Sequence, residues 1–373
     1  MTCLDADVMV IGAGLAGSAA AWALTRRGAE VVVLEGRRVG HLEGSSHGSS
    51  RIFRRAYLKP EYVELTGQAQ HLWSELAGEH GAPLLRRVGG IDHGPDRQIE
   101  QIKAAFDQFG VPSEMLSAAQ AEQRWPGMTF AGEVLFHDEA GVINADETVR
   151  ALLNCATTRG AQLREDAEVD YLEQFPDTVV AHTRDGQAHR ARRVVVAAGA
   201  WESEILPVDI RDRLPATTVT QQQVFHFPLR HPEVAWPAFI HNAGNEVYGL
   251  PSGTDGGKTP AFKVAEHGRG TPTTARTRDF RVDDASRRRI TDYVTRWLPG
   301  LFPEIVAETT CLYTITDDRD FVLDRVGGIV VASPCSGHGA KFTPLIGELL
   351  ADLALTDKPG SARFALHPRR LAR

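Results

Sequence analysis

Three glycines near the start of the chain have the types and spacing needed to bind the phosphates of a dinucleotide. Gly12, Gly14 and Gly17 form the pattern G-x-G-x-x-G directly after an apolar run. The first glycine permits a tight turn, the second lets backbone approach a pyrophosphate, and the third allows a helix to pack closely on a strand. Glu35 ends the next apolar run, where a carboxylate can accept hydrogen bonds from a ribose. These residues predict a dinucleotide-binding site.

The elements that must position these residues follow from the same segment. Residues 8–11 are predicted to form a strand, a helix is expected after the glycine turn, and Gly28 is expected to end that helix. Residues 31–34 are predicted to form a second strand that carries Glu35 to its end. The N-terminus of the helix would present unpaired N–H groups to the phosphates. This order of elements is much more specific than the glycines alone.

Lysine is rare in this chain, and two of its lysines lie where a compact ammonium could do chemistry. Lysine and arginine together number 41, and only six of these residues are lysine. Lys263 lies in an apolar run, and Lys341 lies in a glycine-rich segment. Because arginine is the usual cation of this chain, we expect these two lysines to be required as point charges that a planar guanidinium cannot replace.

Composition excludes several classes of protein. A chain of 373 residues exceeds the roughly 250–300 residues over which one core grows, so two domains are expected. A net charge of -7 argues against a nucleic-acid partner. No apolar run approaches the roughly 18 residues of a membrane span, and the acidic start does not resemble a signal peptide. The cysteines indicate neither a disulfide framework nor a metal site, and they are Cys3, Cys155, Cys311 and Cys335. We expect a cytoplasmic monomer without a metal ion.

Periodicity and turn residues place further elements along the chain. Helices are predicted at residues 61–79, 99–109, 146–159, 284–298 and 344–355. Strands are predicted at residues 162–169, 193–198, 223–227, 246–250, 261–264 and 328–334. A loop that enters a strand or a short helix is expected at residues 44–57, and a hairpin is expected at Asp185-Gly186.

Nucleotide-binding features therefore occur in separated pieces. This discontinuous arrangement resembles flavoproteins more than nicotinamide dehydrogenases, which keep the unit contiguous. The predicted fold is α/β, with a discontinuous, Rossmann-like FAD-binding domain and an inserted antiparallel-sheet substrate domain. The FAD-binding domain is assigned residues 1–88, 139–215 and 305–373, and the substrate domain is assigned residues 89–138 and 216–304.

Several segments, taken in order, carry a resemblance to a known family. They are GSSHGSSRIFRRAY (44–57), VVVAAGAW (194–201), VYGLPS (247–252), AFKVAEH (261–267), CLYTIT (311–316) and SGHGAKF (336–342). Over nearly its whole length the chain resembles the monomeric sarcosine oxidase and N-methyltryptophan oxidase family of the D-amino acid oxidase flavoprotein superfamily. The resemblance implies FAD as the cofactor and oxidation of an N-alkyl or secondary amino acid to its imine. It also implies hydride transfer to the flavin and reduction of dioxygen to hydrogen peroxide.

The resemblance assigns charged residues to substrate and dioxygen. It implies that Arg54 and Lys341 bind the substrate carboxylate and that Arg51 places a cation near the flavin. Lys263 would assist dioxygen on the flavin face opposite the substrate. Considered by themselves, Arg51, Arg54 and Arg55 also fit a solvated charge run, and Lys263 also fits an edge-strand lysine that reaches a surface carboxylate.

Further residues are assigned to the flavin itself. The resemblance implies that Tyr248, His267 and Tyr313 line the substrate face of the ring, and that Cys311 carries the flavin as an 8α-thioether. A small buried hydrophobic residue is the alternative role for Cys311, and Cys335 is a rival that we expect to serve in packing. The residues expected to bind the cofactor are Gly12, Gly14, Gly17, Glu35, Ser45, His47, Arg51, Val169, Gly199, Trp201, Cys311, Gly337, Gly339 and Lys341.

Two departures from the family pattern affect the expected substrate. Ala340 stands where an aromatic residue is common, and Arg55 stands where a histidine is frequent. Both changes could reshape the pocket, so sarcosine itself is not assigned. The alternatives are a biosynthetic tailoring oxidase acting on a cyclic, pipecolate-like imino acid, an NAD(P)H-dependent flavin monooxygenase, and a non-catalytic nucleotide-sensing module.

Overall fold

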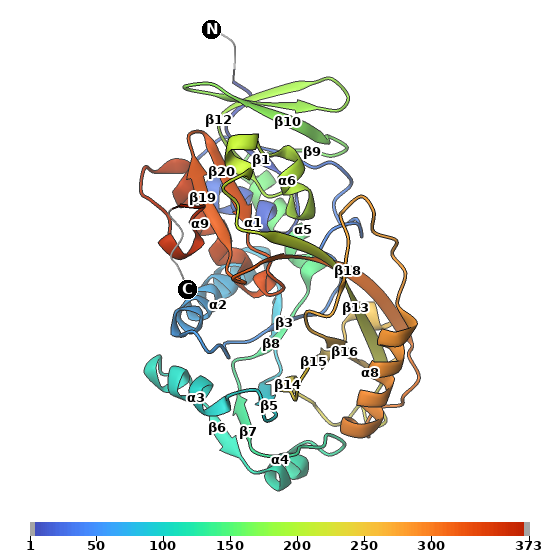
Figure 1. The fold of residues 1–373 in the computed structure, drawn as a ribbon. Helices are drawn as coiled ribbons and strands as arrows, with labels where there is room; N and C mark the ends of the chain where they lie inside the picture. Colours follow the sequence, from blue (N-terminus) through green and yellow to red (C-terminus); the bar gives the residue numbers. More distant parts are fainter. Residues whose placement is uncertain (1–3, 369–373) are drawn as a thin grey trace.

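The computed structural model describes residues 4–368, which form two large sheets, a small third sheet and the helices packed against them (Figure 1). The first sheet has the path β10-β11-β12-β1-β2-β9, with β19 and β20 joined to it through β12. Its strands are β1 (Ala6–Ile11), β2 (Val31–Leu34), β9 (Gln162–Arg164), β10 (Val169–Gln174), β11 (Val179–Thr183), β12 (Ala188–Val196), β19 (Val322–Val326) and β20 (Ile329–Ser333). The strands β9, β2, β1, β12 and β20 are parallel.

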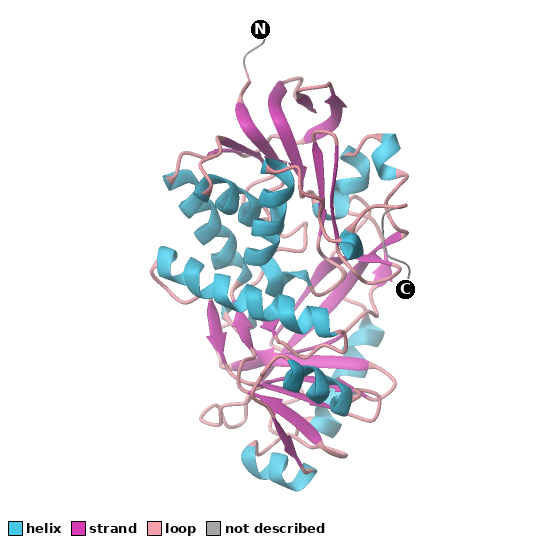
Figure 2. Cartoon of the chain, turned by 90° about the vertical axis from the view of Figure 1, so that its left-hand side faces the viewer, coloured by secondary structure: helices cyan, strands magenta, loops and turns pink. Residues whose placement is uncertain are grey.

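Helices cover one face of this sheet, which Figure 2 shows from the side. They are α1 (Leu15–Arg26), α2 (Pro60–His80), α5 (Ala145–Thr158) and α9 (Thr343–Leu355). The many alanines of α1 let neighbouring backbones approach it closely. A Cβ built on Gly347 of α9 would lie 2.3 Å from the carbonyl oxygen of Ala19. Two short helices, α6 (Glu202–Ile205) and α7 (Val208–Arg211), contribute Ile205 and Ile210 to the core on the other face.

The ends of these helices agree with local sequence signals. Pro60 opens α2, and Gly81 ends it in the left-handed conformation that glycine adopts most easily. The side chain of Asn144 accepts a hydrogen bond from the backbone N–H of Glu147 at the start of α5. These signals are local, and the predicted helices accordingly match the observed ones to within a residue or two.

The second sheet has the path β17-β13-β16-β15-β14-β5-β7-β6, with β18 paired to β13. Its strands are β5 (Gly90–His93), β6 (Glu114–Leu116), β7 (Val134–His137), β13 (Thr217–Pro228), β14 (Ala238–Asn242), β15 (Glu246–Pro251), β16 (Ala261–Glu266), β17 (Thr271–Pro272) and β18 (Ala307–Thr316). All pairs are antiparallel except β14 with β5. The helices α3 (Ile99–Gln108), α4 (Ala118–Arg124) and α8 (Asp284–Trp297) pack around it. The predicted fold class, an α/β nucleotide-binding fold with an inserted antiparallel sheet, is confirmed.

The small third sheet lies between the two large ones (Figure 1). It consists of β3 (Arg51–Phe53), β8 (Gly141–Ile143) and β4 (Leu85–Arg87). Of the two possibilities expected for residues 44–57, the structure has the loop that enters a strand. The chain crosses between the large sheets here, so β3 carries the arginines of that segment to their boundary.

One part of the chain differs from the expected elements. The single strand expected at residues 162–169 is wrong, because β9 and β10 lie at opposite edges of the first sheet. The polar residues between them leave the strand conformation, and Asp166 has a φ of 57°. Residues from 305 onward, assigned to the FAD-binding segments, first form β18, which pairs with β13 of the second sheet.

No helix within residues 4–368 is long and apolar enough to cross a membrane. Cys3, one of the cysteines considered above, lies outside the described residues.

Candidate active site

A cavity runs along the end of the first sheet where the glycine turn lies. Several residues expected to bind a dinucleotide line it, namely Gly12, Gly14, Glu35, Ser45, Val169, Gly199 and Trp201. Gly12 has a φ of +95°, a conformation that side chains rarely allow. A Cβ built on Gly17 would lie 1.8 Å from the carbonyl oxygen of Gly12, so only glycine fits both positions. This tight turn leaves room for a phosphate above the N-terminus of α1.

Three hydrogen bonds to side-chain oxygens organise this turn. One oxygen of Glu35 accepts a hydrogen bond of 2.7 Å from the backbone N–H of Ala13, and the other accepts one of 2.9 Å from Arg37. The hydroxyl of Ser46 accepts a hydrogen bond of 3.0 Å from the backbone N–H of Leu15 at the start of α1. Sequence analysis identified Ser45 but missed Ser46, because nothing in a run of serines shows which one reaches the helix.

A second cavity, of about 440 Å³, continues from the first one. The two cavities share the lining residues Gly14, Ser45, Ser46, Ala197 and Gly199. The second cavity lies against the second sheet, and most of the residues predicted to act on substrate or flavin line it: Arg51, Arg54, Tyr248, His267, Cys311, Tyr313, Gly337, Gly339 and Lys341. The continuous space is shaped for an elongated dinucleotide whose reactive end points toward the substrate sheet. The residues present therefore fit FAD.

The charged groups of Arg54 and Lys341 both lie near the aromatic ring of Tyr57 in this cavity. The guanidinium of Arg54 lies 4.8 Å from the ring centre of Tyr57, and the ammonium of Lys341 lies 5.7 Å from it. Lys341 is buried and donates a hydrogen bond of 2.9 Å to the carbonyl of His338. Burial and the charge of Arg54 hold the pKa of Lys341 well below its usual value. An anion placed between the two cations would relieve this repulsion.

The arginine run of residues 51–55 is not solvated surface. None of its arginines is exposed, and Arg55 is paired with Glu139 at 2.6 Å. The alternative of an exposed charge run is therefore wrong. Arg51 lines the cavity and donates a hydrogen bond of 3.1 Å to the carbonyl of Ser50.

The aromatic residues in the cavity are neutral. Tyr248 on β15 and Tyr313 on β18 are hydrogen-bonded to each other, and burial raises the pKa of Tyr248 to about 12. Burial lowers the pKa of His267 to about 4, and its ring centre lies 5.7 Å from that of Tyr313. A Cβ on Gly337 would lie 2.8 Å from the ring of Tyr313, so this glycine permits the close approach. These side chains can shape and orient a ligand without carrying charge.

Both candidate cysteines line the second cavity. Cys311 lies on β18 and is 8% exposed. The sulfur of Cys335 accepts a hydrogen bond of 3.4 Å from the backbone N–H of Thr314, and burial raises the pKa of its thiol. His47, also expected near the cofactor, is buried, and its Nε2 has no hydrogen-bond partner in the structure.

Lys263 lies in the interior of the second sheet. Its strand, β16, is flanked by β13 and β15, and only 2% of its side chain is exposed. Its ammonium donates to the carbonyl oxygen of Ser50 at 2.9 Å and to the hydroxyl of Ser50 at 3.2 Å. The alternative of an edge-strand lysine that reaches the surface is therefore wrong. Ser50 lines the second cavity, so Lys263 lies directly behind its wall.

Sequence analysis missed several charged residues at or beside the cavity, and three of them bear on the argument. Glu246 and Arg97 line it, and Asp255 is paired with Lys263 behind it. Arg97 is buried and donates a hydrogen bond of 2.6 Å to Asp92. A charged residue in a loop or at a strand end carries no periodic signal, so only the fold brings these residues to the site.

Comparison with known proteins agrees with this geometry. The family described as FAD dependent oxidoreductase matches residues 7–353, and the chain belongs to that family. The chain is therefore an FAD-dependent oxidoreductase, as the sequence predicted, and the alternative of a non-catalytic module is not supported.

Individual relatives narrow the comparison. The chain is 35% identical to the monomeric sarcosine oxidase of Streptomyces avermitilis over 98% of each chain. It is 31% identical to the N-methyl-L-tryptophan oxidase of Yersinia pestis over 95% of this chain and 96% of that one. Among solved structures, the amino acid oxidase NikD in its open form has a TM-score of 0.86 and 24% identity over 98% of each chain, which shows a shared fold. The predicted family is confirmed.

Proposed function

We propose that this protein oxidises the carbon–nitrogen bond at the α-carbon of an N-alkyl or cyclic secondary amino acid to an imine. The observation that carries the proposal is the pair of cations, Arg54 and Lys341, on the ring of Tyr57 inside a cavity continuous with the dinucleotide site. The two relatives are named after sarcosine and N-methyl-L-tryptophan, which are secondary amino acids with a carboxylate that a pair of cations can bind.

The chain's own groups would bind and orient the substrate. Arg54 and Lys341 hold its carboxylate, which fixes the position of the α-carbon. Tyr248, His267 and Tyr313 enclose the amine with neutral groups and exclude water. No side chain has to act as a general base if the amine reacts in its neutral form. FAD, when bound, supplies the hydride acceptor and the route of the electrons to dioxygen.

The finer assignments belong to the same proposal. Cys311 would hold FAD as a thioether, and the glycine turn, Glu35 and Ser46 would hold its pyrophosphate and ribose. Lys263 would stabilise the negative charge that develops on dioxygen, because a fixed cation in a site of low dielectric does so better than water. Hydrogen peroxide would be the second product. We also retain as a proposal the division into two domains, with boundaries at residues 88, 138, 215 and 304. The protein would be a monomer. Its location would be cytoplasmic, as the scarcity of cysteine suggests.

A second candidate is a biosynthetic oxidase of a larger cyclic imino acid. Ala340 lines the second cavity at a position where an aromatic residue is common in the family that the sequence resembles. A small side chain there leaves volume beside the carboxylate-binding pair, which favours a substrate larger than sarcosine.

An anaerobic spectral titration against a panel of secondary amino acids tests both candidates. We expect the flavin absorbance to bleach with an N-alkyl or cyclic secondary amino acid and to return with air as peroxide forms. Bleaching by NADPH, with substrate oxidation dependent on NADPH, would instead establish the monooxygenase alternative. Absence of bleaching by every secondary amino acid in the panel would contradict the proposal.

A further inference from the structure

Asp255 is a partly buried carboxylate that the activity proposed above does not use. It lies in a single 3-10 turn, Thr254–Gly256, which follows β15. Its oxygens accept hydrogen bonds from the hydroxyls of Ser49 and Ser50 at 2.9 and 2.6 Å, and from the backbone N–H of Gly253 at 3.1 Å. Its side chain is 14% exposed. A carboxylate held by this many donors stays ionised, and the pKa of Asp255 is well below its usual range, because neighbouring positive charge and hydrogen bonds outweigh the burial that would raise it.

This carboxylate is also the counter-ion of Lys263. The two charged groups lie 3.4 Å apart, and within residues 4–368 no other carboxylate lies within ion-pair distance of Lys263. An ammonium has three N–H donors. In the structure Lys263 has three acceptors, namely the carbonyl and hydroxyl oxygens of Ser50 and the carboxylate of Asp255. The ammonium is thus fixed in position and orientation.

The other groups that face Lys263 cannot balance its charge. Arg51 on β3 is a second cation and repels it. Two histidines, His226 on β13 and His47 in the loop before β3, are neutral. Burial lowers their pKa values to about 4 and about 3. Cys311 on β18 is the remaining neighbour, and as the proposed flavin thioether it would carry no charge. Burial and Arg51 together lower the pKa of Lys263 to about 8, and Asp255 opposes that shift.

We propose that Asp255 is a positioning residue that keeps the buried ammonium of Lys263 charged and fixed behind the wall of the flavin cavity. The pairing itself does not depend on the function proposed above. Its consequence for catalysis does, because a charged Lys263 is what the reaction with dioxygen would use. Asp255 itself does not line the cavity, so it acts through Lys263.

The charge of Lys263 can be measured without turnover. The chain has only six lysines, so a holoenzyme labelled at the lysine side chains gives few NMR signals, and Lys263→Met identifies that of Lys263. We expect a titration midpoint near pH 8 in the unaltered protein. Asp255→Asn should move the midpoint to lower pH, and Asp255→Glu should restore it. Asp352→Asn, which alters an exposed ion pair with Arg27, should leave it unchanged.

The rate of flavin reoxidation by dioxygen should follow this charge. Lys263→Met should slow reoxidation by orders of magnitude, while anaerobic reduction by substrate changes far less. In Asp255→Asn the loss should be about tenfold at neutral pH for each unit by which the midpoint falls below the assay pH, and lowering the pH should restore the rate. A titration that moves while reoxidation does not would support the pairing and contradict the dioxygen role of Lys263.

An unchanged midpoint in Asp255→Asn would overturn the proposal. Should that variant fail to fold, the double variant Asp255→Asn/Lys263→Met, which has no uncompensated ammonium, is expected to fold and to be more stable than the single variant. A double variant as unstable as Asp255→Asn alone would also overturn it, because the carboxylate would then serve the turn and not the lysine.

Discussion

At the scale of single residues, Arg54 and Lys341 form the expected binding site for a carboxylate. Arg54 is half-buried and Lys341 is buried, and the ring of Tyr57 lies beside both of them. A ring face attracts a cation but does not neutralise it, so the positive charge remains available to an anion. The pair is therefore prepared for a carboxylate before the ligand arrives.

Truncation of either cation should weaken carboxylate binding. A hydrogen bond to a charged group in a site shielded from water is worth roughly 1.5 to 3 kcal/mol, or about ten- to a hundredfold in affinity. We expect Arg54→Ala and Lys341→Ala each to weaken binding of an unreactive carboxylate analogue by about that factor, measured by the spectral change of the flavin. Lys103→Ala, which changes a lysine remote from the cavity, should have no effect. A carboxylate-free amine that reacts as well as the amino acid would refute the assignment.

Cys311 and Cys335 allow a paired test of flavin attachment. Both line the cavity, but only Cys311 lies in the segment that resembles the family's attachment site. If Cys311 forms the thioether, the flavin of the unaltered protein should remain with the chain after acid precipitation, and Cys311→Ser should release it. Cys335→Ser should retain it. Free flavin from the unaltered protein would rule out covalent attachment.

At the scale of elements, two helical glycines differ sharply in their surroundings. A Cβ on Gly17 in α1 would lie 1.8 Å from the backbone oxygen of Gly12, whereas Gly78 in α2 has no atom within 4 Å of its Cβ position. We expect Gly17→Ala to lower the melting temperature and to weaken FAD binding, since helix and strand must separate. Gly78→Ala should be stabilising by up to about 1 kcal/mol, the helix propensity difference. Thermal unfolding with and without added FAD measures both effects, and equal behaviour of the two variants would contradict this account.

The short helix α6 carries a buried carboxyl group that links it to the first sheet. Glu202 accepts a hydrogen bond of 3.1 Å from the backbone N–H of Ala332 on β20, and burial raises its pKa to about 8. Between about pH 4.5 and 8 the folded chain therefore holds a proton that the unfolded chain releases. This group lowers the free energy of unfolding as the pH rises through that window.

Replacement of Glu202 should remove this pH dependence. The difference in free energy of unfolding between Glu202→Gln and the unaltered protein should shift in favour of the variant as the pH rises from 5 to 8. The shift should be up to about 1.4 kcal/mol per pH unit of the window. Thermal unfolding at the two pH values gives the comparison. Glu204→Gln, on the same helix but exposed and paired with Arg276, should leave the difference unchanged. The same pH dependence in Glu202→Gln as in the unaltered protein would show that Glu202 is ionised when folded.

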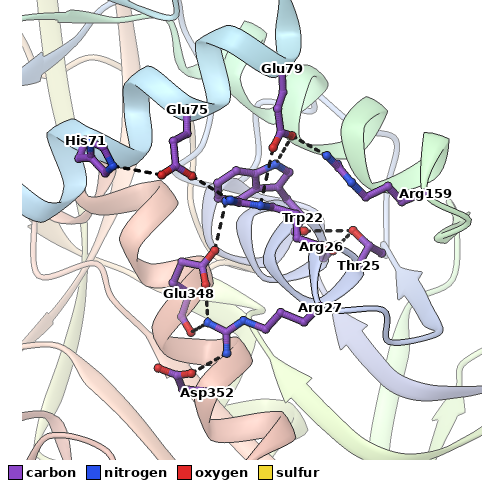
Figure 3. A network of polar contacts seen from close by, with 11 residues as sticks. Trp22, Thr25, Arg26, Arg27, His71, Glu75, Glu79, Arg159, Glu348 and Asp352 are labelled. Carbon is purple, nitrogen blue, oxygen red and sulfur yellow. Dashed lines mark hydrogen bonds and ion pairs between the residues drawn. The ribbon is translucent and has the colours of Figure 1, made fainter.

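On the scale of the whole molecule, an ion-pair network joins helices from both ends of the chain (Figure 3). Arg26 of α1 contacts Glu75 of α2 at 2.8 Å and Glu348 of α9 at 3.3 Å. Glu79 of α2 accepts hydrogen bonds of 2.9 Å from Trp22 and from Arg159 at the end of α5. The network therefore links the C-terminal ends of α1, α2 and α5 to the middle of α9.

Loss of one member should cost a modest, salt-dependent amount of stability. Glu348 contacts both Arg26 and Arg27, so Glu348→Gln is expected to cost about 1 kcal/mol at low salt and less at high salt, where ions screen exposed pairs. Thermal unfolding at both salt concentrations measures this. Glu114→Gln removes a more exposed, isolated pair with Arg124 and should change little. A Glu348→Gln loss that is independent of salt would indicate packing and not charge.

The sequence by itself determined the features whose signals lie in neighbouring residues. The glycine turn with Glu35, the helices with their caps, and the buried parallel strands follow from turn chemistry and periodicity, which act over a few residues. The likeness of several short segments to one family predicted the residues of the cavity, and most of these line it.

Only the tertiary structure decided which distant groups meet. Ser49 and Ser50 lie in a loop some two hundred residues before the turn and the strand that carry Asp255 and Lys263, and no local pattern relates the two groups. The break between β9 and β10 likewise depends on the tertiary structure, because β9 lies at one edge of the first sheet and β10 lies at the other. Periodicity indicates which face of an element is buried but not what that face packs against. The environment of Lys263 and the placement of Arg54 and Lys341 beside one tyrosine ring therefore follow from packing alone.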